Sequence, residues 1–313
     1  IAALGLVLEN FKNASYTKIG KSRIHIRGNS MDKLPEGCIV NILAFMSPRD
    51  ACILSTLSTD FKLGTDSDAL WEKFLPTNFK SIISASSDPS VMERYPSKKD
   101  LYLHLCDNPL LFDGDRKSFS LEKWSGKSKY MLNARDLTII WGDSSKYWRW
   151  VRDDPPRSTE VAELINVCWL EIRGKISTSW LSKGTVYGAY LVLQIPETSA
   201  GFQNSPVEVS IGIGGRELAK RKLIFQIESS GGREFQPRFF ERDSRRNLVD
   251  STCMRDRGDG WFDVKLGDYL NCEGSDPEEL EMTFTETRRR WKSGLRILGM
   301  EIRPADVYSF HQI

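Results

Sequence analysis

Apolar residues recur at helical spacing in three short runs between residues 34 and 75. The runs are Ile39, Ile42, Leu43 and Met46; then Leu54, Leu57 and Phe61; and finally Leu70, Trp71 and Phe74. The first run falls at i, i+3, i+4 and i+7, which places its members on one face of a helix. Three helices in about forty residues are near the lower size limit for independent folding. We therefore expect this unit to need a partner, or the rest of the chain, to cover its apolar surface.

Proline marks the start of two of these helices. Pro35 in Leu34-Pro35-Glu36 suits the first helical position, where its missing N–H costs nothing. Ser47-Pro48-Arg49-Asp50 predicts a second start, with Ser47 as N-cap, Pro48 as first residue and Asp50 as the acidic third residue. A third helix is expected to begin after Ser67, because Leu70-Trp71 follows it.

These motifs, in this order, resemble an F-box. The resemblance implies that the segment binds a Skp-type adaptor and, through it, joins a cullin-based ubiquitin ligase. It implies these contributors to adaptor binding: Leu34, Pro35, Ile39, Ile42, Leu43, Pro48 and Trp71. The alternative is that the same side chains are only the internal core of a small helical domain.

The second half of the chain changes to the period-two pattern of half-buried strands. Strands are predicted at Val207–Ile213, Leu280–Phe284, Cys168–Ile172, Ala189–Ile195 and Leu295–Ile302, the last with a bulge at Gly299. Short strands punctuated by Gly and Pro favour a β-sandwich of jelly-roll type. Another helix is expected near Ser97, after a Ser- and Asp-rich segment.

The predicted fold is therefore an α+β multidomain chain. We expect an extraneous or poorly ordered extension at 1–30, a three-helix F-box at 31–77 and a linker with a short helix at 78–117. An all-β sandwich is expected to occupy 118–313. Met31 is the expected natural start.

The β half resembles the phloem protein 2 family, the plant lectins related to the tobacco agglutinin. The motifs that carry the resemblance are Ala134–Gly142, Tyr147–Trp150, Glu160–Leu164, Cys168–Ile176, Asp259–Phe262 and Trp291–Gly294, continuing to Ile302-Arg303-Pro304. The resemblance implies a lectin domain, a plant source, and ligands that contain N-acetylglucosamine oligomers or the chitobiose core of N-glycans.

Such sugars need an aromatic platform and polar groups that orient hydroxyl and acetamide groups. Trp141 and Trp148 are the platform candidates, since they flank a turn-like Gly142-Asp143-Ser144-Ser145 segment. By the resemblance, Glu279 and Glu286 match acidic residues of the lectin's binding region. Seven residues on a straight strand place the two on opposite faces, so Glu286 would have to lie beyond the strand end. Alternatively the tryptophans are core residues and the glutamates are solvated rim charges.

Composition narrows the possible functions. The net charge is only +2, from 44 Lys and Arg against 42 Asp and Glu, so no nucleic-acid or membrane partner is expected. Two short basic runs could act as nuclear-import signals or, more simply, be solvated loops or strand ends. They are Lys220-Arg221-Lys222 and Arg288-Arg289-Arg290. Six scattered cysteines and three distant histidines offer no ligand spacing, so we expect no metal and no cofactor.

We therefore expect a non-catalytic receptor of the cytoplasm and/or nucleus. Its F-box would bind the adaptor, and its lectin domain would present a glycan or glycoprotein for ubiquitin transfer. In the alternative, the lectin-like domain has lost sugar binding and recruits a protein target directly. A glycosidase is not supported, because nothing in the sequence supports the geometry that a catalytic carboxylate pair needs.

Overall fold

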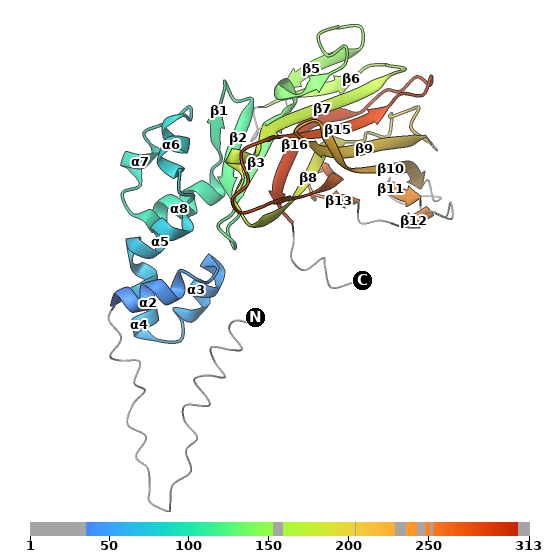
Figure 1. The fold of residues 1–313 in the computed structure, drawn as a ribbon. Coiled ribbons are helices and arrows are strands. Elements are labelled where there is room, and N and C mark those ends of the chain that lie inside the picture. The colour runs from blue at the N-terminus through green and yellow to red at the C-terminus, as the bar shows by residue number, and fades with distance from the viewer. Residues whose placement is uncertain are drawn as a thin grey trace, which may run out of the picture. The chain divides into compact units, whose positions relative to one another are not determined.

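The computed structural model describes residues 36–152, 159–203, 205–228, 236–242, 248–250 and 253–305. Helices come first along the chain and strands follow (Figure 1). The helices are α2 (Glu36–Leu43), α3 (Pro48–Leu54), α4 (Thr59–Asp66), α5 (Asp68–Phe74), α6 (Phe79–Ser84), α7 (Val91–Arg94) and α8 (Lys98–Asp107). Leu34, Pro35 and the predicted extension at 1–30 lie outside the described residues.

Serine caps set the helix boundaries. The Ser47 hydroxyl accepts a hydrogen bond from the Asp50 N–H at 3.1 Å and donates to the Asp50 carboxylate at 2.8 Å, as predicted. The Ser97 hydroxyl caps α8 by accepting a hydrogen bond from the Asp100 N–H at 3.3 Å. The prediction that the second helix continues to Phe61 was wrong. Ser58 caps a separate helix, α4, by accepting from the Phe61 N–H at 3.2 Å, so α3 ends at Leu54.

The segment expected to be a linker with one short helix contains α6, α7 and α8. Phe79 and Ile83 of α6 and Leu101 and Tyr102 of α8 are buried. The Tyr102 ring packs 5.0 Å from that of Trp71 in α5, centroid to centroid. These helices therefore share one core with the helices that precede them.

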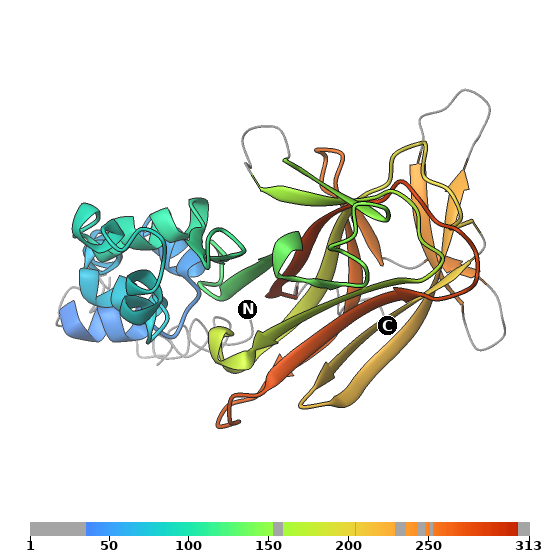
Figure 2. The same ribbon diagram turned by 90° about the horizontal axis from the view of Figure 1, so that it is seen from above.

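The β part is built of two antiparallel sheets. Its strands are β1 (Leu110–Phe112), β2 (Lys117–Leu121), β3 (Ser128–Asn133), β4 (Thr138–Ile139), β5 (Trp148–Arg152), β6 (Glu160–Leu164), β7 (Leu170–Ser177), β8 (Thr185–Gln194), β9 (Pro206–Ile213), β10 (Arg216–Glu228), β11 (Gln236–Arg242), β12 (Leu248–Asp250), β13 (Met254–Asp256), β14 (Phe262–Asn271), β15 (Glu279–Glu286) and β16 (Arg296–Pro304). Among the described residues, one sheet runs β1-β2-β3-β16-β8-β14-β13, with β6 joining β16 to β5. The other runs β12-β11-β10-β9-β15-β7-β4, and Figure 2 shows β7, β15 and β9 side by side. A helical N-terminal part followed by an antiparallel β domain confirms the predicted fold class.

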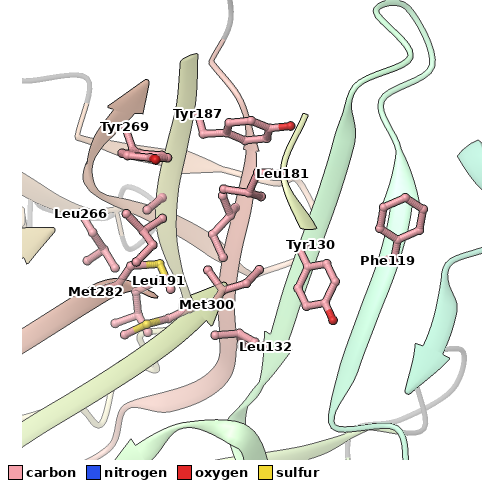
Figure 3. Packing of buried hydrophobic residues seen from close by; sticks show 14 of the residues in the cluster. Phe119, Tyr130, Leu132, Leu181, Tyr187, Leu191, Leu266, Tyr269, Met282 and Met300 are labelled. Atoms are coloured by element: carbon pink, nitrogen blue, oxygen red, sulfur yellow. The ribbon is translucent and has the colours of Figure 1, made fainter. Parts of the chain in front are cut away.

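Alternating apolar positions form the core between the sheets. Every second residue of β9, from Val207 to Ile213, is buried, and β15 repeats the pattern with Leu280, Met282 and Phe284. Figure 3 shows Met282 and Met300 among these packed side chains. The sheets approach closely at Gly174 of β7, where a Cβ would lie 2.7 Å from the Met300 sulfur. The predicted bulge in β16 is confirmed, since its pairing register shifts between Ile297 and Gly299.

The turn between β2 and β3 packs against the helices. The Tyr102 hydroxyl donates to the Lys123 carbonyl at 3.0 Å, and the Arg49 N–H donates to the Trp124 carbonyl at 3.3 Å. A Cβ on Gly126, whose φ is +71°, would lie 3.3 Å from the Pro48 ring. Pro48 is thus buried on its own chain.

Candidate functional site

A tight turn presents Trp141. The Gly142 N–H donates to the Ile139 carbonyl at 2.9 Å, and the Ser144 N–H donates to the Trp141 carbonyl at 3.0 Å. Trp141 itself has φ of +58°, in the left-handed region that bulky residues rarely occupy. The residue is 43% exposed, and its indole packs 5.2 Å from the Tyr147 ring, centroid to centroid. The turn therefore presents one aromatic face to solvent.

Trp148 supports this turn from within. Its side chain is 2% exposed, and its indole N–H donates to the Ile140 carbonyl at 3.1 Å. Trp150 donates similarly to the Gly142 carbonyl at 2.9 Å. Of the two predicted platform tryptophans, only Trp141 is accessible to a ligand.

The structure does not bring Glu279 and Glu286 together. They begin and end β15, and their partners across the β7 ladder are Ser177 and Leu170. Seven residues of strand span about 23 Å. Glu279 is exposed and pairs with Lys175 at 2.7 Å, whereas Glu286 is buried.

Glu286 forms a buried ion pair with Lys292. The Lys292 ammonium donates to the carbonyls of Cys168, Arg288 and Arg290 at 2.8, 3.0 and 2.8 Å. Burial lowers the pKa of Lys292 to about 8. The Ser205 hydroxyl donates to Glu286 at 2.9 Å. The pair therefore fixes the backbone of the loop that follows β15.

The segment from Ile165 to Glu171 connects this loop to the Trp141 turn. The Ile165 N–H donates to the Tyr147 carbonyl at 2.9 Å, and the Ile140 N–H donates to the Glu171 carbonyl at 3.1 Å. Val167 forms an isolated antiparallel bridge with Lys292.

Two exposed tryptophans, Trp169 and Trp291, lie on these segments, and neither was among the predicted site residues. Trp169 directly precedes β7, so an aromatic residue just outside a strand was the available signal for it. Trp291 lies between β15 and β16, away from both strand ends, and had no such signal.

The predicted adaptor-binding residues within the described chain are mostly internal. Ile39, Leu43, Pro48 and Trp71 are buried, and Ile42 is half-buried. The Trp71 indole N–H donates to the Thr65 carbonyl at 2.6 Å. These side chains hold the helices together.

Other apolar side chains, on α3 and α4 and in the turns that follow α2 and α3, face solvent. Phe45 is 93% exposed, Leu57 is 70% and Leu63 is 64%, and Ile53 is exposed as well. They lie between the end of α2 and the middle of α4. Exposed apolar side chains gathered on one short stretch of chain are typical of an interaction surface.

The described residues contain no group of three His, Cys, Asp or Glu side chains that could hold a metal ion. None of their helices is both long and apolar enough to cross a membrane.

Comparison with known proteins identifies two domains. The F-box domain model matches residues 31–73, and the phloem protein 2 model matches residues 127–304. The chain belongs to the F-box phloem protein 2 family. It is 41% identical over 289 residues to F-box protein PP2-B10 of Arabidopsis thaliana, which covers 92% of this chain and 98% of that one. F-box protein PP2-B1 of the same plant is 37% identical over 314 residues, covering 89% and 91%.

In this F-box phloem protein 2 protein, the two matched regions contain all the predicted site residues. The F-box match also includes Phe45, Leu57 and Leu63, and the phloem protein 2 match includes Trp169 and Trp291. An F-box followed by this domain is the layout of a receptor-type F-box protein.

Proposed function

We propose that this protein is the target-binding subunit of a Skp/cullin/F-box ubiquitin ligase of the cytoplasm or nucleus. Its helices bind the Skp-type adaptor, and its β-sandwich binds glycans or glycoproteins that contain N-acetylglucosamine. The chain positions the target, and associated subunits transfer the ubiquitin.

The exposed apolar side chains between the end of α2 and the middle of α4 support adaptor binding. The helices already bury Leu43, Leu70 and Trp71, so Phe45 and Leu63 are not needed for their own core. A partner that covers these side chains gains about 2 kcal/mol for each fully buried large apolar group. Leu34 and Pro35 lie outside the described residues and remain proposed contributors to adaptor binding.

Trp141 is the observation that carries the sugar-binding proposal. A left-handed conformation costs a residue with a side chain about 1 kcal/mol or more. Here the surrounding hydrogen bonds hold that conformation and leave the indole half exposed. Strain of this kind is concentrated at binding sites, and an exposed indole suits the apolar face of a sugar ring.

The test is a glycan array probed with the full chain co-purified with a Skp-type adaptor. We expect binding to N-acetylglucosamine oligomers or N-glycan cores, weakened about tenfold or more by Trp141→Ala. Trp124→Ala removes another exposed tryptophan, from the β2–β3 turn, and should leave binding unchanged. Equal binding by the Trp141 and Trp124 variants would refute the assignment of Trp141.

Recruitment of an unglycosylated protein is the second candidate. It is favoured by the burial of Trp148 and Glu286, which leaves only two of the four predicted sugar contacts accessible. Absence of any glycan binding by a correctly folded chain would replace the sugar proposal with this one.

A further inference from the structure

Three consecutive arginines project from the loop after β15. Arg288, Arg289 and Arg290 are all exposed, and Trp291, which follows them, is exposed too. Adjacent like charges repel one another, so this arrangement costs free energy unless something compensates for it.

No carboxylate among the described residues pairs with any of these three guanidinium groups. Other arginines of the β domain do have carboxylate partners. Arg149, for example, pairs with Glu163 at 2.6 Å. Only Arg290 has a described side-chain bond, from its guanidinium to the Gln203 carbonyl at 3.2 Å. Within the part of the chain that the structure describes, the loop therefore carries a local positive charge with no paired carboxylate.

The loop is held rigidly although it is exposed. The buried Lys292 ammonium donates to the carbonyls of Arg288 and Arg290, so hydrogen bonds fix alternate residues of the loop to the protein interior. On the other side Gly201, with φ of +87°, allows close approach, because a Cβ there would lie 1.9 Å from the Trp291 carbonyl oxygen. Ala200 bridges to Ser293 in the same region. A preorganised loop binds a ligand with less loss of conformational entropy.

Aromatic surface accompanies the charge. The Val167–Lys292 bridge aligns the loop with the segment that carries Trp169, whose indole N–H donates to Glu171 at 2.9 Å. Trp169 and Trp291 thus lie on neighbouring, hydrogen-bonded segments. A ligand for this surface needs an apolar face that can stack on the indoles. It also needs anionic groups, because an arginine guanidinium can form two parallel hydrogen bonds to carboxylate or sulfate oxygens.

An acidic sugar meets both requirements. We propose that Arg288, Arg289 and Arg290, with Trp291 and Trp169, bind the carboxylate or sulfate groups of an anionic glycan. This inference rests on the proposed sugar-binding function and specifies the ligand class as uronic-acid-containing or sulfated carbohydrate.

The test compares four probes by biolayer interferometry on the full chain with its adaptor. The probes are chitotriose, trigalacturonate, a sulfated trisaccharide and a hexaglutamate peptide. At least one acidic trisaccharide should bind about tenfold more tightly than neutral chitotriose, and added salt should weaken it. The better of the two acidic sugars identifies the anionic group.

A charge-matched pair of variants separates a specific site from a general electrostatic effect. Replacing Arg288, Arg289 and Arg290 by Gln removes three cations that have no carboxylate partner among the described residues, and should weaken acidic-sugar binding about tenfold or more. Replacing Lys175, Lys220 and Lys222 by Gln removes three exposed cations that are paired with glutamates, and should have little effect. Circular dichroism confirms folding of both.

Each contrary outcome has its own meaning. Binding of chitotriose with no preference for acidic sugars overturns this inference and leaves the proposed function intact. Tightest binding of hexaglutamate, or equal losses in the two triple variants, overturns it in favour of an acidic peptide or of net charge alone. Failure of the folded chain to bind any sugar overturns the proposed function as well.

Discussion

Lys292 has a fully buried ammonium group whose described partners are one carboxylate and three backbone carbonyls. A lysine is almost never buried so completely unless it is paired. Its position suits a structural role, because the carbonyls it binds belong to two segments that are far apart in the sequence. The pair with Glu286 orders the loop that carries the exposed arginines.

Lys292→Met should lower the free energy of unfolding by about 3 kcal/mol, because Glu286 is left buried without a countercharge. Urea unfolding followed by circular dichroism measures this loss. Lys175→Met, which breaks an exposed pair, should change stability by less than about 1 kcal/mol. The double variant Lys292→Met, Glu286→Met should be more stable than Lys292→Met alone. Similar losses of unfolding free energy in Lys292→Met and Lys175→Met would contradict the structural role of Lys292.

Residue-level chemistry was the hardest part to predict from sequence. Resemblance to lectins selected Glu286, but nothing local distinguishes a glutamate that contacts ligand from one that binds a lysine six residues later. Trp141 and Trp148 have the same chemistry and flank the same turn. Only strand pairing and the turn conformation determine that one indole is exposed and the other buried.

At the scale of elements, the spacing of apolar residues predicted the buried faces of helices and strands well, but it predicted the breaks between helices poorly. The stripe that begins at Ile39 correctly identified the inner face of α2, where Ile39 and Leu43 are buried, but Met46 lies beyond the end of that helix. The alternation in β9 and β15 identified the buried faces of these strands. Phe45 falls outside the stripe, and an apolar residue off the buried face was the sequence signal for an interaction surface. The break between α3 and α4 was missed, because Leu54, Leu57 and Phe61 satisfy helical spacing across it.

Phe45→Glu combined with Leu63→Glu should abolish co-purification of a Skp-type adaptor, since burying two carboxylates in an apolar interface is strongly unfavourable. Pull-down from co-expressing cells measures the effect. The matched control is Leu218→Glu, which changes an exposed leucine of β10 and should retain the adaptor. Full recovery of adaptor with the double variant would locate the contact elsewhere.

At the scale of the whole molecule, a network of ion pairs connects strands of the sheet that contains β14 and β16. Arg257, from the loop between β13 and β14, contacts Asp263 of β14 and Glu301 of β16, at 2.5 and 2.6 Å. Arg303 bridges the same two carboxylates at 2.8 and 2.9 Å. Burial alone would raise the pKa of Glu301, but the nearby Lys129, Arg257 and Arg303 outweigh it and lower that pKa to about 2.

This network predicts loss of stability in acid. A carboxylate whose folded pKa is lowered stabilises the fold fully above its unfolded pKa of 4.5, and this contribution is lost as pH falls toward 2. For Glu301 the loss amounts to about 3 kcal/mol. Urea unfolding at several pH values from 7 down to 3 should show the decline.

Glu301→Gln should be less stable than the parent at pH 7 and should lose less on acidification. The matched control Glu279→Gln, at an exposed glutamate, should keep the parent's pH dependence. A parent-like decline in the Glu301 variant would assign the acid sensitivity to other carboxylates.

In the loop after β15, different residues hold the backbone and face solvent. This separation affects how the binding specificity of the loop could change during evolution. Glu286, Lys292 and Gly201 fix its backbone, whereas the side chains of Arg288, Arg289 and Trp291 point outward and contribute little to folding. If the loop binds a ligand as proposed, exchanging those outward side chains would alter what is recognised without altering the backbone that holds them. On the proposed function, duplicated copies of the protein would then acquire new ligands by a few surface substitutions and keep the same fold.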